Sequence, residues 1–310
     1  MKNLFKYLSL FIITLVMSSA TASADYQKGY DAYVKGYDAY VAGDYATALR
    51  EWRPLAEQEY SIAQYDLGVL YANGEGVPQD DEEAVRWYRL AAVQGYAKAQ
   101  FNLGFMYDKG RGVPQDDVEA VKWYRLAAEQ GDADAQTNLG NMYEKGIGVP
   151  QDDVEAAKWH RLAADQGDAY AQFSLGYMYE KGRGVPQDDV EAVKWFSLAA
   201  EQGDAFAQFS LGVMYYNGRG VPQDDVEAVK WYRLAADQGE VDAQYNLGNM
   251  YANGEGLPQD DVEAYKWWNL AAAQGEAFAK SNKEIVERVM TKQQIAEGQR
   301  LSREWFNEHQ

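Results

Sequence analysis

The sequence contains no cysteine and only two histidines among its 310 residues. Without cysteine the chain has no disulfide framework, no thiol chemistry and no lipid-modified N-terminal cysteine. Lysine and arginine number 29 against 48 aspartates and glutamates, which gives a formal net charge of −19. This shortage of positive charge argues against binding to nucleic acid or to anionic lipid, because phosphate contacts need clustered lysine and arginine.

Recognisable catalytic motifs are absent as well. The chain has no Ser-x-x-Lys, no Gly-x-Ser-x-Gly and no His-Glu-x-x-His. Its Gly-x-Gly segments lack the lysine and the strand-to-helix context of a phosphate-binding loop. We therefore predict no catalytic residue, no cofactor and no metal ligand, and we expect a protein that is not an enzyme.

Long apolar runs are also missing, except near the N-terminus. Lys2 and Lys6 precede a short apolar run, and Ala22-Ser23-Ala24 provides small residues for cleavage before Asp25. This pattern predicts a secretory signal peptide at residues 1–24, cleaved after Ala24, with a retained N-terminal anchor as the alternative. Cleavage would take the net charge from −19 to −21. In a bacterial chain the mature protein would be periplasmic or secreted, without membrane insertion.

A repeated segment dominates the remainder of the sequence. The twelve letters GVPQDDVEAVKW occur at Gly112–Trp123, Gly184–Trp195 and Gly220–Trp231. The dipeptide Ala-Gln recurs every 36 residues, which defines six units: 63–98, 99–134, 135–170, 171–206, 207–242 and 243–278. A fixed period of this length is typical of solenoid proteins, so we count positions 1 to 36 of each unit from its alanine.

Each unit predicts two helices, as the unit 135–170 illustrates. Asp132 is an N-cap for the first helix, and Gly146 suits the left-handed residue after its end. Asp152 opens the second helix, and Glu155 three residues later predicts a capping box. The expected apolar face of this second helix consists of Ala156, Trp159, Leu162 and Ala163.

The repeated letters therefore have structural explanations: a loop exit, a proline stop, a capped helix start and a core tryptophan. A ladder of Asp-Asp pairs that bind Ca²⁺ is the alternative, with adventitious surface binding as its weaker form. A calcium loop needs six to eight oxygen ligands, and the spacing does not resemble an EF-hand. The pattern favours a structural role.

The pattern A-Q-x-x-L-G-x-x-Y-x-x-G-x-G-V-P-Q-D-x-x-x-A-x-x-W-x-x-x-A-A-x-Q-G, found at Ala99–Gly131, resembles the Sel-one-like repeat (SLR) family. The resemblance covers all six units. It implies an all-α, right-handed superhelical solenoid of antiparallel helix pairs, related to tetratricopeptide repeats, that acts as an adaptor or scaffold. A cysteine-rich branch of the family is linked to penicillin binding and β-lactam hydrolysis. The absence of those cysteines here gives no basis for carrying that activity over.

The segments that flank the units read as covers for the ends of the solenoid. Residues 25–62 contain a doubled heptad, GYDAYVK and GYDAYVA, followed by a degenerate tetratricopeptide-like hairpin. Residues 279–310 read as closing helices. Terminal repeats need polar covers, so we predict an N-terminal capping hairpin and a C-terminal helical cap.

A variable face of the first helices is the candidate binding surface. On a wheel of about 100° per residue, the constant positions 1, 5, 8 and 9 point one way, and the variable positions 3, 4, 7, 10, 11 and 36 point the other way. In tetratricopeptide-like solenoids the first helices line the concave side. The candidate partner-binding residues are Phe101, Asn102, Phe105, Lys109, Asn138, Asn141, Lys145, Tyr170, Phe173, Tyr177, Lys181, Phe206, Phe209, Tyr216, Tyr245 and Asn249. Packing of single aromatic rings against the next repeat remains open.

Four other features receive structural interpretations. The glutamine at position 2 of every unit predicts an inter-helix hydrogen bond rather than a ligand contact. Gly140 and its equivalents predict a close approach of two helices, because glycine within a helix is otherwise unfavourable. His160 is interpreted as a tolerated substitution on a helix face. Trp267 and Trp268 are assigned to the core.

Two function classes are consistent with these observations. The favoured one is a non-catalytic, exported scaffold that binds a protein or an extended peptide in the cell envelope. The alternative is a cell-envelope enzyme, or a regulator of one, that acts on peptidoglycan or β-lactams. The absence of a nucleophile–base arrangement favours the scaffold.

Overall fold

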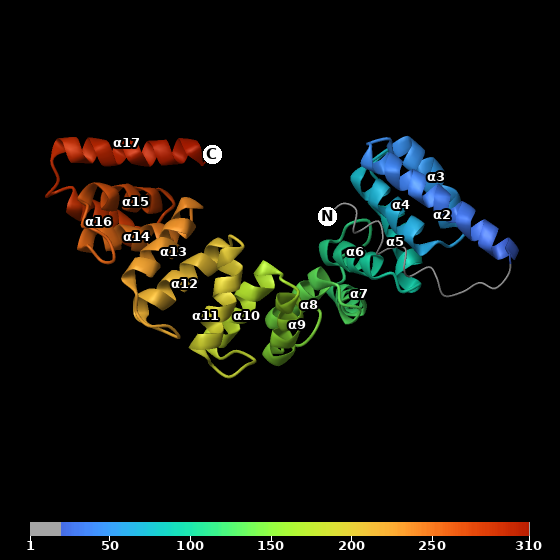
Figure 1. Cartoon of the computed structure of the whole chain (residues 1–310), viewed down its shortest axis with the longest axis horizontal. Coiled ribbons are helices and arrows are strands. Elements are labelled where there is room, and N and C mark those ends of the chain that lie inside the picture. Colours follow the sequence, from blue (N-terminus) through green and yellow to red (C-terminus); the bar gives the residue numbers. More distant parts are fainter. Residues whose placement is uncertain (1–19, 310) are drawn as a thin grey trace. The chain divides into compact units, whose positions relative to one another are not determined.

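A computed structural model describes residues 20–309, and residues 1–19 of the predicted signal peptide lie outside this part. All regular structure between residues 20 and 309 is helical (Figure 1). None of the helices found there has the length and apolar character needed to span a bilayer. These helices confirm the predicted all-α fold.

The chain divides into two compact structural units that are larger than the 36-residue repeats: unit 1 at residues 1–130 and unit 2 at residues 131–310. From here on, the six 36-residue sequence units are called repeats. The helices of unit 1 are α2 (Ala20–Val41), α3 (Tyr45–Glu57), α4 (Ser61–Asn73), α5 (Asp81–Val93), α6 (Ala97–Lys109) and α7 (Asp117–Glu129). The helices of unit 2 are α8 (Ala133–Lys145), α9 (Asp153–Asp165), α10 (Ala169–Lys181), α11 (Asp189–Glu201), α12 (Ala205–Asn217), α13 (Asp225–Asp237), α14 (Val241–Asn253), α15 (Asp261–Ala273), α16 (Ala277–Val286) and α17 (Lys292–Glu308).

Each repeat is a hairpin of two helices of 13 residues. Within each unit the two helices of a hairpin pack closely, and the second helix then packs on the first helix of the next hairpin (Figure 1). Because each repeat packs mainly on the repeats next to it, it cannot bury its apolar surface alone. This stacking is the solenoid arrangement that the period predicts.

Helix capping follows the predicted chemistry with one correction. The Asp152 carboxylate accepts hydrogen bonds from the backbone N–H groups of Val154 and Glu155, as an N-cap does. The predicted capping box is wrong, because the N–H of Asp152 donates instead to the carbonyl of Tyr143 at 3.0 Å. Glu155 pairs with Lys158, at 3.3 Å. The N-cap N–H is thus satisfied by the preceding helix, and the glutamate is left to the helix surface.

The glycine at position 6 brings the two helices of each hairpin together. A Cβ atom added to Gly140 would lie 2.7–2.9 Å from three atoms of the His160 ring, and one added to Gly176 would lie 2.7 Å from Phe196. The predicted close approach is confirmed. His160 corrects an expectation: it is fully buried beneath Gly140 rather than on a tolerant helix face, in the place that Phe196 fills one repeat later.

The glutamines at position 2 form the predicted inter-helix bonds. The Gln172 side chain donates to the carbonyl of Ala164 at 3.1 Å and accepts from the side chain of Gln202 at 2.8 Å. Gln208 repeats both bonds with Ala200 and Gln238. These amides are nearly fully buried, so each bond satisfies a group that would otherwise be costly to bury.

The C-terminal helices end the stack of hairpins. α16 packs on α15 as the first helix of a further repeat would, but positions 5 and 6 of that repeat are Lys283 and Glu284 in place of leucine and glycine. A second helix therefore has no apolar surface to cover there. α17 instead lies along α15 (Figure 1), where Gly298 contacts the ring of Tyr265.

α17 also explains a second correction, which concerns Leu162. The apolar pattern predicts this leucine on the buried face of its helix, yet 42% of its surface is exposed, as for Leu234 at 43%. The equivalent Leu270 is only 4% exposed, because α17 packs on the cluster that contains it. Position 28 is thus a surface position except where α17 covers it. Trp267 and Trp268 are both buried, as predicted.

Candidate partner-binding surface

The variable positions 3, 4, 7, 10, 11 and 36 form one face of the first helices, which we call the A-face. In unit 1 it includes Phe101, Asn102, Phe105 and Lys109 on α6. The remaining predicted residues lie in unit 2, on α8, α10, α12 and α14. Unit 2 therefore carries most of the predicted surface.

The aromatic residues at position 3 are held in place by the core. Phe173 lies 5.9 Å from Phe196, ring centre to ring centre, and Phe209 lies 5.9 Å from Tyr232. In unit 1, Phe101 makes the same contact with Tyr124 at 5.7 Å. These rings are half-buried, so for them packing and surface roles coexist: one side rests on the core and the other stays accessible.

The residues at position 36 extend this surface outward. Phe206 is 61% exposed although its ring lies 6.0 Å from that of Phe173 on the neighbouring first helix. Phe278 repeats the arrangement with Tyr245, at 6.5 Å and 69% exposure. Tyr170 is also largely exposed. Two aromatic pairs therefore lie on the A-face, one between α10 and α12 and one between α14 and α16, and each has one largely exposed ring.

The predicted lysines are exposed, and two of them lie over aromatic rings. The ammonium of Lys181 is 5.5 Å from the ring centre of Tyr177 and 2.9 Å from a carboxylate oxygen of Glu180. In unit 1, Lys109 lies 5.9 Å from the ring of Phe105. Lys145 is exposed at the end of α8. Cation–π contacts of this kind are weak at exposed sites, so these side chains remain available to a partner.

The predicted asparagines are less accessible. Asn102, Asn138 and Asn141 are half-buried. Asn249 accepts hydrogen bonds from the indole N–H of Trp268 at 3.1 Å and from Asn282 at 3.0 Å. At least one of the predicted asparagines therefore stabilises the packing of the repeats rather than being available to a partner.

A groove opens where the A-face reaches the C-terminal helices. Its volume is about 540 Å³, and its lining joins Tyr216, Tyr245, Asn249, Ala252, Asn253, Asp261, Trp268, Asn282, Ile285, Val286 and Val289. Ile285 and Val289 are 57% and 76% exposed. The groove combines an apolar wall with amide and carboxylate groups, which is the usual composition of a recognition site.

Sequence reasoning included Tyr216, Tyr245 and Asn249 but missed the other side of this groove. Ile285 and Val289, which line the groove, occupy positions 7 and 11 when the count continues past the sixth repeat, and Phe278 beside Tyr245 occupies position 36. That continuation was the available signal. This signal was easy to miss because the residues that are constant in every repeat stop after Phe278, while the A-face continues on α16.

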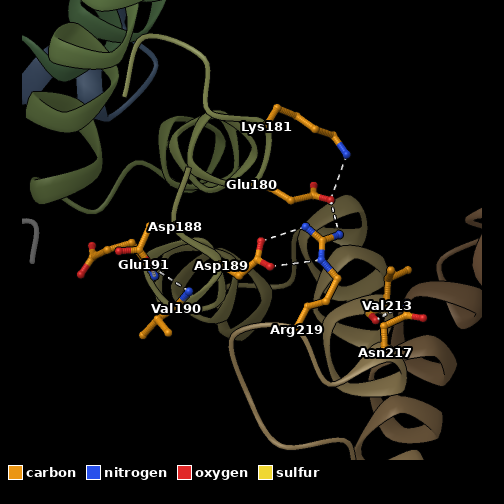
Figure 2. Close-up of polar contacts among 9 residues, drawn as sticks. All are labelled: Glu180, Lys181, Asp188, Asp189, Val190, Glu191, Val213, Asn217 and Arg219. Carbon is orange, nitrogen blue, oxygen red and sulfur yellow. Dashed lines mark hydrogen bonds and ion pairs between the residues drawn. The ribbon is translucent and has the colours of Figure 1, made fainter. Parts of the chain in front are cut away.

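Between repeats, loop arginines bind carboxylates of the preceding repeat. The guanidinium of Arg219 donates to both carboxylate oxygens of Asp189, at 2.8 and 3.2 Å, and to Glu180 at 2.9 Å (Figure 2). The pKa of Arg219 is raised, chiefly by its hydrogen bonds to these two carboxylates. Arg183 binds Asp153 and Glu144 in the same way. In unit 1, Arg111 binds Asp81.

These bonds also account for the Asp-Asp pairs. The first aspartate, such as Asp188, caps the helix, and the second, such as Asp189, holds the loop arginine (Figure 2). Among residues 20–309 no group of three or more histidine, aspartate or glutamate side chains is placed to hold a metal ion. In the pairs Asp152–Asp153 and Asp188–Asp189 the two carboxylates thus make separate structural bonds.

Comparison with known proteins agrees with this architecture. The Sel1 repeat model matches six consecutive segments, 61–96, 97–132, 133–168, 169–204, 205–240 and 241–276. The chain belongs to the Sel1 repeat family. Each matched segment begins two residues before the alanine at position 1, so it starts at the first helix of a hairpin. Proteins built from Sel1 repeats are generally protein-interaction scaffolds.

Two solved structures are similar over most of the chain. A Sel1 repeat protein from Oxalobacter formigenes is 38% identical, with a TM-score of 0.68 over 78% of this chain and 96% of that one. The protein c5321, a protective antigen present in uropathogenic Escherichia coli strains, displays an SLR fold and is 35% identical, with a TM-score of 0.68 over 93% of this chain and 70% of that one. A search of curated proteins found no match.

Proposed function

We propose that this Sel1 repeat protein is an exported, non-catalytic scaffold that binds a protein or an extended peptide through its A-face. The observation that carries the proposal is the presence of two aromatic pairs on the A-face, Phe173 with Phe206 and Tyr245 with Phe278, together with the groove on α12, α14 and α16. Large rings that stay exposed while they rest on a rigid core lose little conformational freedom on binding, which suits them as anchors.

Export rests on the sequence of residues 1–24. A positive start, a short apolar run and Ala22-Ser23-Ala24 give the mature protein an N-terminus at Asp25. Expression in a Gram-negative host followed by cell fractionation and intact-mass measurement tests this. A periplasmic or secreted species that starts at Asp25 supports export, and a full-length species retained in the cytoplasm contradicts it.

Paired measurements of stability and binding test the A-face. Tyr170→Ala and Phe206→Ala remove exposed rings, so the melting temperature should change little, while capture of envelope proteins should weaken by about 1–2 kcal/mol for each ring. Phe209→Ala, at a half-buried ring, should lower both. Val190→Ala is the matched control, because Val190 is 64% exposed but lies on a second helix.

The outcomes separate clearly. Loss of binding in the two A-face variants, with Val190→Ala unchanged, supports the proposal. Equal binding by all variants at matched folded fractions contradicts it. Turnover assays with peptidoglycan fragments and a β-lactam on the same preparations would reveal an enzyme, the alternative class.

A further inference from the structure

The loops of unit 2 meet the preceding repeats in one fixed register. A Cβ atom added to the second glycine of a loop would overlap the backbone carbonyl of the aspartate at position 19 of the preceding repeat; the pairs are Gly184 with Asp153, Gly220 with Asp189 and Gly256 with Asp225. All three glycines have a positive φ of 67–71°. The residue just before the glycine, at position 13, is therefore held beside the same aspartate at each junction.

At two of these junctions position 13 is an arginine, and it neutralises the carboxylates around it. Arg219 binds Asp189 through two hydrogen bonds and Glu180 through a third (Figure 2). Arg183 makes the corresponding contacts one repeat earlier. The backbone contact and the aspartate at position 19 together form a binding site for a guanidinium group.

At the third junction the arginine is replaced by Glu255. Gly256 makes the same backbone contact with Asp225, and the residue beside it at position 13 carries a carboxylate instead of a guanidinium group. The hydroxyl of Tyr216, at position 10, donates to Glu255 at 3.3 Å. Burial raises the pKa of Tyr216, and the negative charges of Glu255 and Asp225 add to that rise. The tyrosine thus lies in the field of both carboxylates.

This junction lacks a cation of its own. The hydrogen-bond donors to Asp225 and Glu255 are the neutral amides of Gln223 at 3.2 Å and Asn253 at 3.3 Å, together with Tyr216. Within residues 20–309, no lysine or arginine forms an ion pair with either carboxylate. Two carboxylates that both act on Tyr216 without a paired cation favour the binding of a cation there.

The acidic junction adjoins the groove through Tyr216 and Asn253, which line the groove and donate hydrogen bonds to Glu255. Asp261, the position-19 aspartate of the sixth repeat, lines the groove as well. The last segment that matches the Sel1 repeat ends at residue 276, and within residues 20–309 no lysine or arginine forms an ion pair with Asp261. Tyr245, Ile285 and Val289 also line the groove. Carboxylates at the junction and apolar side chains in the groove fit a segment that carries a cation next to an apolar residue.

We propose that the groove binds an arginine of a partner peptide at Asp225 and Glu255, with a neighbouring apolar side chain of the peptide against Ile285 and Val289. The proposal rests on the proposed function, because it names the residue type that the A-face recognises. Arginine is favoured over lysine because the planar guanidinium binds two carboxylates at once, as Arg219 does. The net charge of −19 would also speed the approach of a basic segment.

Peptide selection with matched variants tests this proposal. A random dodecapeptide library displayed on phage is selected on the mature wild-type protein, on Glu255→Arg and on Phe206→Ser. Glu255→Arg supplies the arginine that the two earlier junctions contain. This arginine should occupy the guanidinium-binding site at Asp225 without lowering the melting temperature. We expect arginine beside an apolar residue to be enriched on the wild type and on Phe206→Ser, and to lose that enrichment on Glu255→Arg.

The best selected peptide is then synthesised with arginine and with citrulline, its neutral isostere. Citrulline should weaken binding on the order of tenfold, and so should Asp225→Asn or Glu255→Gln, because each removes one partner of a charged hydrogen-bonded pair. Glu201→Gln is the control, since Glu201 is an exposed carboxylate at the end of a second helix.

Three results overturn the proposal. They are selected peptides without basic enrichment, a Glu255→Arg variant that binds the arginine peptide as well as wild type does, and binding that needs Ca²⁺ but ignores the citrulline change. If peptides without arginine are selected on the wild type and lost on Phe206→Ser, this inference fails while A-face binding stands. If none of the three proteins enriches any peptide, both proposals fail.

Discussion

The third repeat (residues 135–170) and the sixth repeat (residues 243–278), called repeats 3 and 6, have the same backbone arrangement but different side chains at their closest helix contact. In repeat 3 the close approach is between Gly140 and His160, and in repeat 6 it is between Gly248 and Trp268. The added-Cβ distances are similar, 2.7 Å to His160 and 2.6 Å to Trp268. A ring of either size is accommodated at position 26 because the glycine makes room for it.

The polar atoms at these two sites differ more than the packing does. Trp268 and Asn282 both donate to the carbonyl oxygen of the Asn249 side chain, at 3.1 and 3.0 Å. In repeat 3 the equivalent Asn141 oxygen and both ring nitrogens of His160 are buried without a hydrogen-bond partner within the described structure. The packing of the two helices thus requires a flat ring over the glycine, but it does not require the polar atoms of that ring to form hydrogen bonds.

Truncation of the position-26 ring should have the largest effect and should differ between the two repeats. Trp268→Ala removes a large buried side chain and the donor to Asn249, so we expect a loss of about 3–5 kcal/mol of unfolding free energy. His160→Ala should cost less, because it also removes two unsatisfied polar atoms. Urea denaturation of both variants measures the difference; equal losses would contradict the comparison.

Acid should destabilise the protein through His160. Burial lowers the pKa of His160 from 6.5 to about 4. Between these values the unfolded chain binds the proton and the folded chain does not, so the stabilising contribution is present above pH 6.5 and is lost as the pH falls toward 4. The expected loss is about 3 kcal/mol.

The carboxylate nearest to this ring does not remove the effect. Glu144 lies 3.9 Å from the ring of His160, but Arg183 already binds it. Unfolding curves between pH 7 and pH 4, for wild type and His160→Phe, measure the difference. His160→Phe should flatten the part of the pH dependence that comes from this residue. An identical slope in the two proteins would show that His160 does not contribute.

Filling the glycine position should destabilise both repeats. Gly140→Leu places a side chain in the space of the His160 ring and should cost about 1–3 kcal/mol by overpacking. Gly248→Leu should cost at least as much, because the tryptophan ring is larger and is held by Asn249. Thermal unfolding measures both, and a raised melting temperature in either variant would contradict close packing, since leucine is the better helix former.

Removal of an N-cap should have the smallest effect and should be equal in the two repeats. Asp152 and Asp260 each accept hydrogen bonds from two backbone N–H groups of the following helix turn. Replacement of either by alanine should cost roughly 0.5–2 kcal/mol. The same chemical denaturation series measures it. A much larger loss at one of the two sites would mean that the caps are not equivalent parts of the frame.

The sequence predicted the helix pairs and their caps well because these features depend on contacts between residues that lie close together in the sequence. Caps, the glycine after each first helix and the period of 36 residues depend on contacts within one hairpin or with the next one. The glutamine bonds could be foreseen for the same reason: a buried amide in every repeat must find a partner nearby. The family match and the helices confirm this part.

The candidate surface was less predictable. A helical wheel places Phe173 and Phe206 on one face, but it does not show that one ring is half-buried while the other is 61% exposed. Periodicity also predicts Leu162 on the buried face of its helix, which is wrong, and the interpretation of His160 as a tolerated substitution on a helix face did not reveal that its ring is fully buried. Periodicity gives the direction of a side chain, whereas exposure depends on which neighbouring helix covers it.

By itself, then, the sequence determined the helix pairs, their caps and their order, because each of these follows from residues within about one repeat of each other. Tertiary structure alone decided which residues meet across a junction. Arg219 binds Asp189 only because Gly220 lets the two backbones touch, and Gly256 makes the same contact with Asp225 beside Glu255 of the next loop. Charge pairing between repeats depends on that contact through space, and the linear spacing does not record it.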